Sequence, residues 1–225
     1  MVNDPMSLSH KFLPDCLEIR VVLFTIHQGH LQVLLVSNQE NGWQLPGGKI
    51  LANLSLEKTA ADCVRKITGE RQTYLEQLYT YGDVSNDKET RLISIIYFAL
   101  IPDATIPQTI DGFEHKWFPV STFPVIEPAQ AEVIPYALRR LRYKIEYSAV
   151  GFELLPAVFT LTDLQHTYEI ILGESLDKRN FRRRILEAGV IEPTSARKQG
   201  EGRPAQLFRY RPDAVAEVKA RRLFP

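Results

Sequence analysis

The sequence predicts an α/β (α+β) fold made of two domains, residues 1–148 and residues 149–225. In the first, Val-, Leu- and Ile-rich segments of strand length are separated by turn residues and surround one clear helical pattern. In the second, two helical patterns joined by a short turn precede a strand pair with a basic, glycine-containing tip. That order of elements is typical of a winged helix-turn-helix.

Four segments of the first domain are predicted to be strands. Leu17–Ile26 and Leu31–Ser37 are rich in aliphatic residues and are joined by HQGH, which favours a hairpin. Arg91–Ile101 has the composition of a buried strand, and Lys116–Val120 that of a shorter one.

Two helices are expected in the same domain. The first covers about Ser55–Thr68 and ends before Gly69, which suits the left-handed residue after a helix. Its apolar residues recur at helical spacing: Leu56, Ala60, Val64 and Ile67. The second is a linker helix over about 128–148, in which Pro135 predicts a break or kink.

The second domain begins with a helix over Phe159–Gly173, where Thr160 and Asp163 have capping-box spacing, although Asp replaces the usual Glu or Gln. The next helix spans Leu176–Gly189. A polar, basic segment then leads into the strand-like LFRYR, so we expect a hairpin with a wing.

Composition limits the class of protein. With 225 residues, 44% of them hydrophobic and 24% charged, the chain can bury a core and is ordinary for a soluble protein. Net charge is zero, yet residues 177–211 hold ten basic against four acidic side chains, which suits a polyanionic partner. Cys16 and Cys63 match no metal or redox spacing, and no apolar run reaches membrane-spanning length. We expect a cytoplasmic protein with no membrane contact.

Residues 45–70, LPGGKILANLSLEKTAADCVRKITGE, resemble the Nudix box, whose pattern is G-x5-E-x7-R-E-U-x-E-E-x-G-U. Aligning the first glycine with Gly48 places the last on Gly69, so the length and both ends agree. This spacing, with the preceding strands and GWQLPGG, outweighs the alternative of an ordinary tight turn before a helix. The resemblance implies a Nudix-like α/β/α sandwich.

The acidic residues of that box are missing. Its first glutamate falls on Leu54, its Arg-Glu pair on Asp62 and Cys63, and its Glu-Glu pair on Lys66 and Ile67. Nudix enzymes cleave nucleoside diphosphate derivatives with Mg²⁺, a hard cation that needs oxygen ligands. Positions 63, 66 and 67 share one helical face, which here carries a thiol, an ammonium and an aliphatic group. We therefore expect no catalytic residues, no metal site and no hydrolysis.

The rest of the loop suits a diphosphate that is held without being cleaved. GWQLPGGK supplies backbone N–H groups and a lysine near a helix start, and Lys66 can attract the anion in place of a metal. Trp43 either stacks on a base or fills the core, and Arg20 and Arg91 either reach the diphosphate or are solvated or paired. The candidate effector-binding residues are Arg20, Trp43, Gly47, Gly48, Lys49, Lys66 and Arg91.

The second helix of the smaller domain is strongly basic. Arg179 and Arg183 lie one turn apart and opposite Phe181 and Ile185, so the apolar face can dock while the basic face points outward. An isolated basic run is usually a solvated face, but a second basic element at wing spacing favours DNA. The candidate DNA-binding residues are Lys178, Arg179, Asn180, Arg182 and Arg183 on the helix, and Arg197, Lys198 and Arg203 on the wing loop.

The segment VGFELLPAVFTLTDLQHTYEIILGESLDKRNFRRRILEAGVIEPT, followed by GRPAQLFRY, is similar to the winged-helix domain of the Nudix-related transcriptional regulators, the NrtR family. The linker matches the same family, so the resemblance runs from about Leu17 to Tyr210. It implies a repressor of genes of NAD metabolism that responds to ADP-ribose or a related nucleotide. Because one winged helix makes only a small interface with DNA, we expect a homodimer that binds palindromic operator DNA. No other cofactor is implied.

Three alternatives remain open at this point. The chain is a Nudix hydrolase of ADP-ribose or another nucleoside diphosphate derivative, a sugar-responsive regulator of the same family, or a ligand-binding protein whose basic tail docks on RNA or protein. Two histidines, His115 and His166, have no second ligand at metal spacing and are predicted to lie on the surface.

Overall fold

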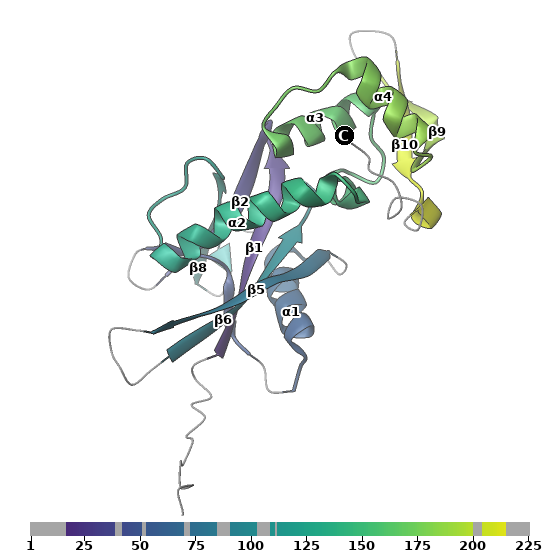
Figure 1. Cartoon of the computed structure of the whole chain (residues 1–225). Helices are drawn as coiled ribbons and strands as arrows, with labels where there is room; N and C mark the ends of the chain where they lie inside the picture. Colours follow the sequence, from purple (N-terminus) through teal and green to yellow (C-terminus); the bar gives the residue numbers. More distant parts are fainter. Residues whose placement is uncertain are drawn as a thin grey trace, which may run out of the picture.

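The computed structural model of the protein describes residues 17–38, 42–50, 53–69, 73–84, 91–102, 109–110, 112–199 and 204–214. Figure 1 shows a sheet domain and a smaller helical domain, with a long helix, α2 (Pro128–Ile145), running across the sheet toward the smaller domain. Within the described residues, no helix combines the length and the apolar character that crossing a membrane requires.

The larger domain is built on a mixed sheet, in which β1 is parallel to β6 and antiparallel to β2. The main strand order is β5–β6–β1–β2–β8–β7, with β3 beside β2 and β4 beside β1. The strands are β1 (Leu17–His27), β2 (His30–Ser37), β3 (Trp43–Gln44), β4 (Gly47–Lys49), β5 (Tyr74–Val84), β6 (Arg91–Leu100), β7 (Thr109–Ile110) and β8 (Phe113–Pro119). The four predicted strands are confirmed, although β8 begins three residues earlier than expected.

The hairpin between β1 and β2 turns as HQGH predicts. Gln28 and Gly29 both have positive φ, 50° and 75°, which is the backbone that a two-residue hairpin loop requires.

Helix α1 (Leu56–Thr68) forms where the sequence predicts it. The Ser55 hydroxyl accepts a bond from the backbone N–H of Lys58 at 3.2 Å, and Gly69 ends the helix at φ 72°. Leu56, expected on the apolar seam, is 37% exposed because it lies at the first position of the helix. The buried residues of α1 are Thr59, Ala60, Val64 and Ile67.

The two helices cover opposite faces of the sheet. Because side chains alternate along β1, Val21 and Leu23 pack with the buried residues of α1, whereas Val22 and Phe24 pack with those of α2. This is the α/β/α layering that the sequence predicts.

Of the break or kink expected at Pro135, the break is wrong, because α2 runs through this position. The helix is continuous for 18 residues, and Pro135 lies on its exposed side, where water can satisfy the carbonyl that loses its donor. Glu127 caps its start by accepting from the backbone N–H groups of Ala129 and Gln130, both at 3.0 Å.

The smaller domain has the predicted helix-turn-helix and hairpin. Thr160 and Asp163 form a complete capping box, with the Asp163 N–H donating to Thr160 Oγ1 at 3.0 Å and the Thr160 N–H donating to the Asp163 carboxylate at 2.9 Å. Aspartate therefore completes the capping box at this position. The elements are the 3-10 helix η2 (Ala149–Leu154), α3 (Leu161–Leu172), α4 (Lys178–Glu187), β9 (Ile191–Lys198), β10 (Ala205–Tyr210) and the 3-10 helix η3 (Pro212–Ala214).

One of the two clusters of buried side chains, the cluster on the α2 side of the sheet, is shared by both domains. It extends from β1 and α2 into α3 and α4, where Tyr168 meets Phe181 with ring centroids 5.6 Å apart. Gly151 lies close beside Tyr168, and a Cβ there would lie 3.1 Å from the ring, so that the ring would have to shift by a few tenths of an ångström. At the junction, Arg142 of α2 donates from Nε to the carbonyl of Ile171 in α3 at 2.7 Å.

Candidate functional site

A cavity of about 460 Å³ opens between residues 44–49, α1 and the β7–β8 hairpin. This volume is within the range of small-molecule sites. The side chain of Arg91, at the start of β6, lies outside the described residues. The structure brings five of the candidate effector residues to this cavity: Arg20, Gly47, Gly48, Lys49 and Lys66.

The charged residues of the cavity wall are mainly basic, although the Arg20 guanidinium is paired with Glu18 at 2.7 Å. Arg20, Lys49 and Lys66 line the cavity, and the described lining includes one carboxylate, that of Asp62. Asp62 is paired with Arg65 at 2.6 Å, which offsets its charge. The balance favours an anionic ligand.

The face of α1 that carries metal ligands in Nudix enzymes points into the cavity, as the helical spacing predicts. Cys63, Lys66 and Ile67 all line it. Burial raises the pKa of the Cys63 thiol to about 11, although Arg20 and Lys66 act in the opposite direction, so the thiol is neutral at pH 7. No group of three His, Cys, Asp or Glu side chains in the described ranges could hold a metal ion. Cys63, Lys66 and Ile67 offer no oxygen ligand, so this face of α1 does not fit Mg²⁺.

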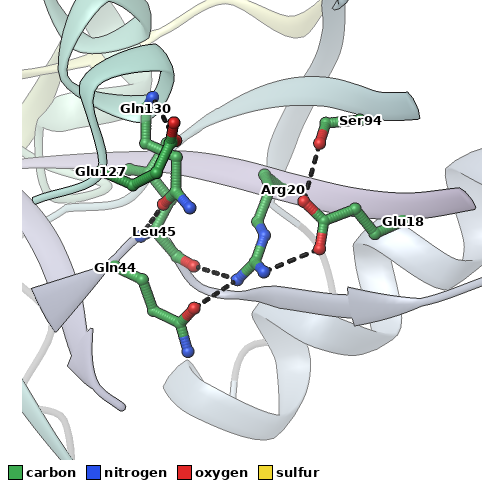
Figure 2. A network of polar contacts seen from close by, with 7 residues as sticks. All are labelled: Glu18, Arg20, Gln44, Leu45, Ser94, Glu127 and Gln130. Carbon is green, nitrogen blue, oxygen red and sulfur yellow. Dashed lines mark hydrogen bonds and ion pairs between the residues drawn. The ribbon is translucent and has the colours of Figure 1, made fainter. Parts of the chain in front are cut away.

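Arg20 is held in a polar network at the cavity wall (Figure 2). Its guanidinium donates to Glu18 at 2.7 Å, to the side chain of Gln44 at 3.1 Å and to the carbonyl of Leu45 at 3.0 Å. Glu18 is buried and also accepts from Ser94 at 2.7 Å. The Arg20 Nε atom is buried and has no hydrogen-bond partner in the described structure, so the guanidinium has donor capacity left.

The two glycines of the loop have different reasons to be there. A Cβ on Gly47 would lie 2.0 Å from the carbonyl oxygen of Ile19 and 3.0 Å from the Cα of Arg20, because β4 is paired directly against β1. A Cβ on Gly48 would meet nothing within 4 Å. Gly47 therefore fixes the approach of the loop to the sheet.

Trp43 does not line the cavity. It lies on β3 against the core, and its ring meets that of Phe118 edge to face at 5.0 Å. Of the two roles that the sequence leaves open, this placement favours packing over base stacking.

The cavity also has walls that the sequence analysis missed. Gln44, Ile110, Phe113 and His115 line it, the last three from the β7–β8 hairpin. The prediction of a surface His115 is wrong: it is 8% exposed, with Nδ1 3.0 Å from the Phe113 carbonyl. Extending the predicted strand by three residues toward the N-terminus would have placed His115 on its inner side. His166 is exposed, as predicted.

Helix α4 has the two faces that its sequence predicts. Phe181 and Ile185 are buried, whereas Arg179 and Arg183 are exposed on the opposite side. Arg183 donates to Glu187 and to the Asn180 side chain. Among the other candidates, Lys178 is exposed and Arg182 bonds Thr162 on α3 at 3.0 Å.

The wing differs from its prediction in one respect. Arg197 and Lys198 belong to strand β9 and pair with β10, so their placement on the loop is wrong. Lys198 contacts Asp163 at 3.3 Å, which joins the wing to the start of α3. Arg203 lies outside the described residues.

Comparison with known proteins decides the family. The ADPR responsive transcriptional repressor NtrR of Acinetobacter baylyi is 36% identical over 203 residues, which cover 85% of this chain and 80% of that protein. The chain belongs to the NrtR family. The family model of the NrtR DNA-binding winged helix domain matches residues 151–210.

Solved NrtR structures support the whole architecture. Shewanella oneidensis NrtR in complex with a 27mer DNA superposes with a TM-score of 0.76 at 31% identity, covering 89% of this chain and 96% of that one. The Nudix domain of the same protein in complex with ADP ribose superposes with a TM-score of 0.50 at 30% identity, covering 62% and 94%. This NrtR chain is a DNA-binding transcriptional regulator, with a Nudix-like sensing domain followed by a winged helix.

Proposed function

We propose that the protein is a cytoplasmic repressor of NAD metabolism genes, and that its cavity binds ADP-ribose, or a closely related nucleoside diphosphate, without cleaving it. One observation carries the proposal: Lys66 lines the cavity on the helical face where a Nudix enzyme holds its metal. An ammonium there attracts a diphosphate but neither coordinates nor activates water. The relatives named above, one ADPR responsive and one crystallised with ADP ribose, support the same ligand.

The proposal predicts that the charge of Lys66 is needed for ligand binding. In calorimetry, Lys66→Glu should weaken ADP-ribose binding about 10- to 100-fold, because the reversed charge repels the diphosphate across the cavity. Lys58→Glu makes the same change on an exposed position of α1 outside this cavity and should leave binding within about twofold. Equal effects of the two variants would refute a diphosphate site at Lys66.

The same samples distinguish the alternatives. ADP-ribose incubated with the protein and Mg²⁺ should yield no AMP and ribose 5-phosphate above background, whereas steady release of both would establish a hydrolase. Binding of a pentose but not of ADP-ribose would identify a sugar-responsive regulator.

We further propose that a homodimer binds a palindromic operator. One winged helix contacts few base pairs, so specific regulators usually combine two of them on half-sites about 10 base pairs apart or multiples of that. The 27mer in the Shewanella complex is about two and a half turns long, which is enough for two half-sites. A suitable operator for this chain is obtained by selection from random 27-base-pair duplexes.

Two substitutions should separate base reading from phosphate contact. If the exposed guanidinium of Arg183 reads a base, Arg183→Ala should weaken binding to the selected duplex by about 1–3 kcal/mol and should weaken binding to random duplex much less. Lys198→Ala should weaken both alike and lower the salt slope by about one. Fluorescence anisotropy over a salt series measures both, with Arg65→Ala on α1 as a charge-matched control. Equal loss on both duplexes for Arg183→Ala would assign that residue to the backbone.

A further inference from the structure

Gln130, in the first turn of α2, is bonded to the cavity loop. It is buried, and its side-chain carbonyl accepts from the backbone N–H of Leu45 at 2.8 Å (Figure 2). Leu45 itself is fully buried and lines the cavity. Because the bond is buried, removing the Gln130 acceptor leaves the Leu45 N–H without a partner, which destabilises this arrangement of the loop.

The other side of Leu45 is held by Arg20. The guanidinium donates to the Leu45 carbonyl and to Gln44 while it pairs with Glu18. The chain from Gln44 to Leu45 is thus fixed between a cavity arginine and α2. An anionic ligand that takes donors of Arg20 competes with these acceptors and alters the hold on Leu45.

The far end of α2 is fixed to the DNA-binding domain. Arg142 donates to the Ile171 carbonyl at the C-terminal turn of α3, where the partial negative charge of the helix end favours the guanidinium. Gly173 ends α3 with φ 78°, and a Cβ there would lie 3.2 Å from Arg142. One uninterrupted helix therefore joins the cavity loop to α3, on which the basic helix α4 packs.

We propose that Gln130 is the positioning residue that couples the cavity to DNA binding. The Leu45–Gln130 bond holds α2 in the arrangement that binds DNA. A ligand that draws Arg20 away from the Leu45 carbonyl weakens the hold on Leu45 and so frees α2 to leave that arrangement. The inference rests on the proposed function, because it requires a ligand that changes DNA affinity. A ligand shifts such an equilibrium only by its different affinity for the two states, and the effect is reciprocal.

The test uses three variants of the full chain: Gln130→Met, which keeps the length but removes the acceptor, Gln130→Glu, which keeps an acceptor, and the control Glu132→Gln on the exposed side of α2. Affinity for the selected duplex is measured with and without saturating ADP-ribose, and ADP-ribose affinity is measured on free protein. In the wild type, ADP-ribose should weaken DNA binding by roughly 5- to 150-fold. Gln130→Met should imitate the ligand-bound state, so its DNA affinity falls and its ADP-ribose affinity rises. The ratio of its DNA affinities without and with ADP-ribose should approach one. Glu132→Gln should behave as the wild type, and Gln130→Glu, which keeps the acceptor but buries a charge, should still lose DNA affinity when ADP-ribose binds.

Opposite changes in the two affinities distinguish coupling from damage. If Gln130→Met weakens both DNA and ADP-ribose binding, Gln130 only supports the structure and the inference is wrong. The inference is also wrong if the variant responds to ADP-ribose as the wild type does. If the wild type itself binds DNA and ignores ADP-ribose, it is the proposed function that fails, and the inference with it.

Discussion

Alanine at position 47 is expected to destabilise the protein and to abolish ADP-ribose binding. The added Cβ would lie 2.0 Å from the Ile19 carbonyl oxygen, so β4 must move away from β1 and the cavity loop with it. Forcing atoms into packed structure costs about 1–3 kcal/mol or more, which lowers the melting temperature by about 2–4 °C per kcal/mol in a chain of this size. Differential scanning fluorimetry and calorimetry measure the two effects.

Gly48→Ala is the matched control, because its Cβ meets open space. It should change stability by less than about 0.5 kcal/mol, as surface substitutions usually do. If both variants have the melting temperature of the wild type, the close approach of Gly47 to β1 does not constrain the residue at this position.

Phe181→Ala should cost about 3–5 kcal/mol of unfolding free energy and remove DNA binding. The ring is 3% exposed and packs on Tyr168, so its loss leaves a cavity under the basic helix and frees α4 to shift. Leu186→Ala, on the same helix but 52% exposed, should cost much less. Urea unfolding and anisotropy measure stability and DNA affinity. Tight DNA binding by Phe181→Ala would show that α4 does not depend on this contact.

Local signals in the sequence predict the elements near the site. Ser55 and Gly69 mark the ends of α1, and Thr160 with Asp163 marks the start of α3, because each of these residues satisfies backbone groups within a few positions of itself. The inward face of α1 also follows from spacing alone. These features depend on near neighbours, which a single sequence displays.

Strands β5 and β7 and the first three residues of β8 do not follow from the sequence, because the evidence for them lies far away along the chain. Strand β5 is an edge strand of the described sheet, and its residues 74–82 are mostly half-buried, so the segment lacks the aliphatic composition of a central strand. Strand β7 is two residues long, too short for any periodicity. The bond between Leu45 and Gln130 joins positions 85 residues apart, and no local pattern marks it.

The shared core has a consequence for how the molecule melts. Tyr168 and Phe181 belong to the same buried cluster as Phe24 and the buried residues of α2. Separating the two domains would therefore expose this apolar cluster to water. The two domains should then unfold together in one cooperative transition on heating or in denaturant. A small molecule that fills the cavity should then protect the winged-helix domain against proteolysis, although it touches no atom of that domain.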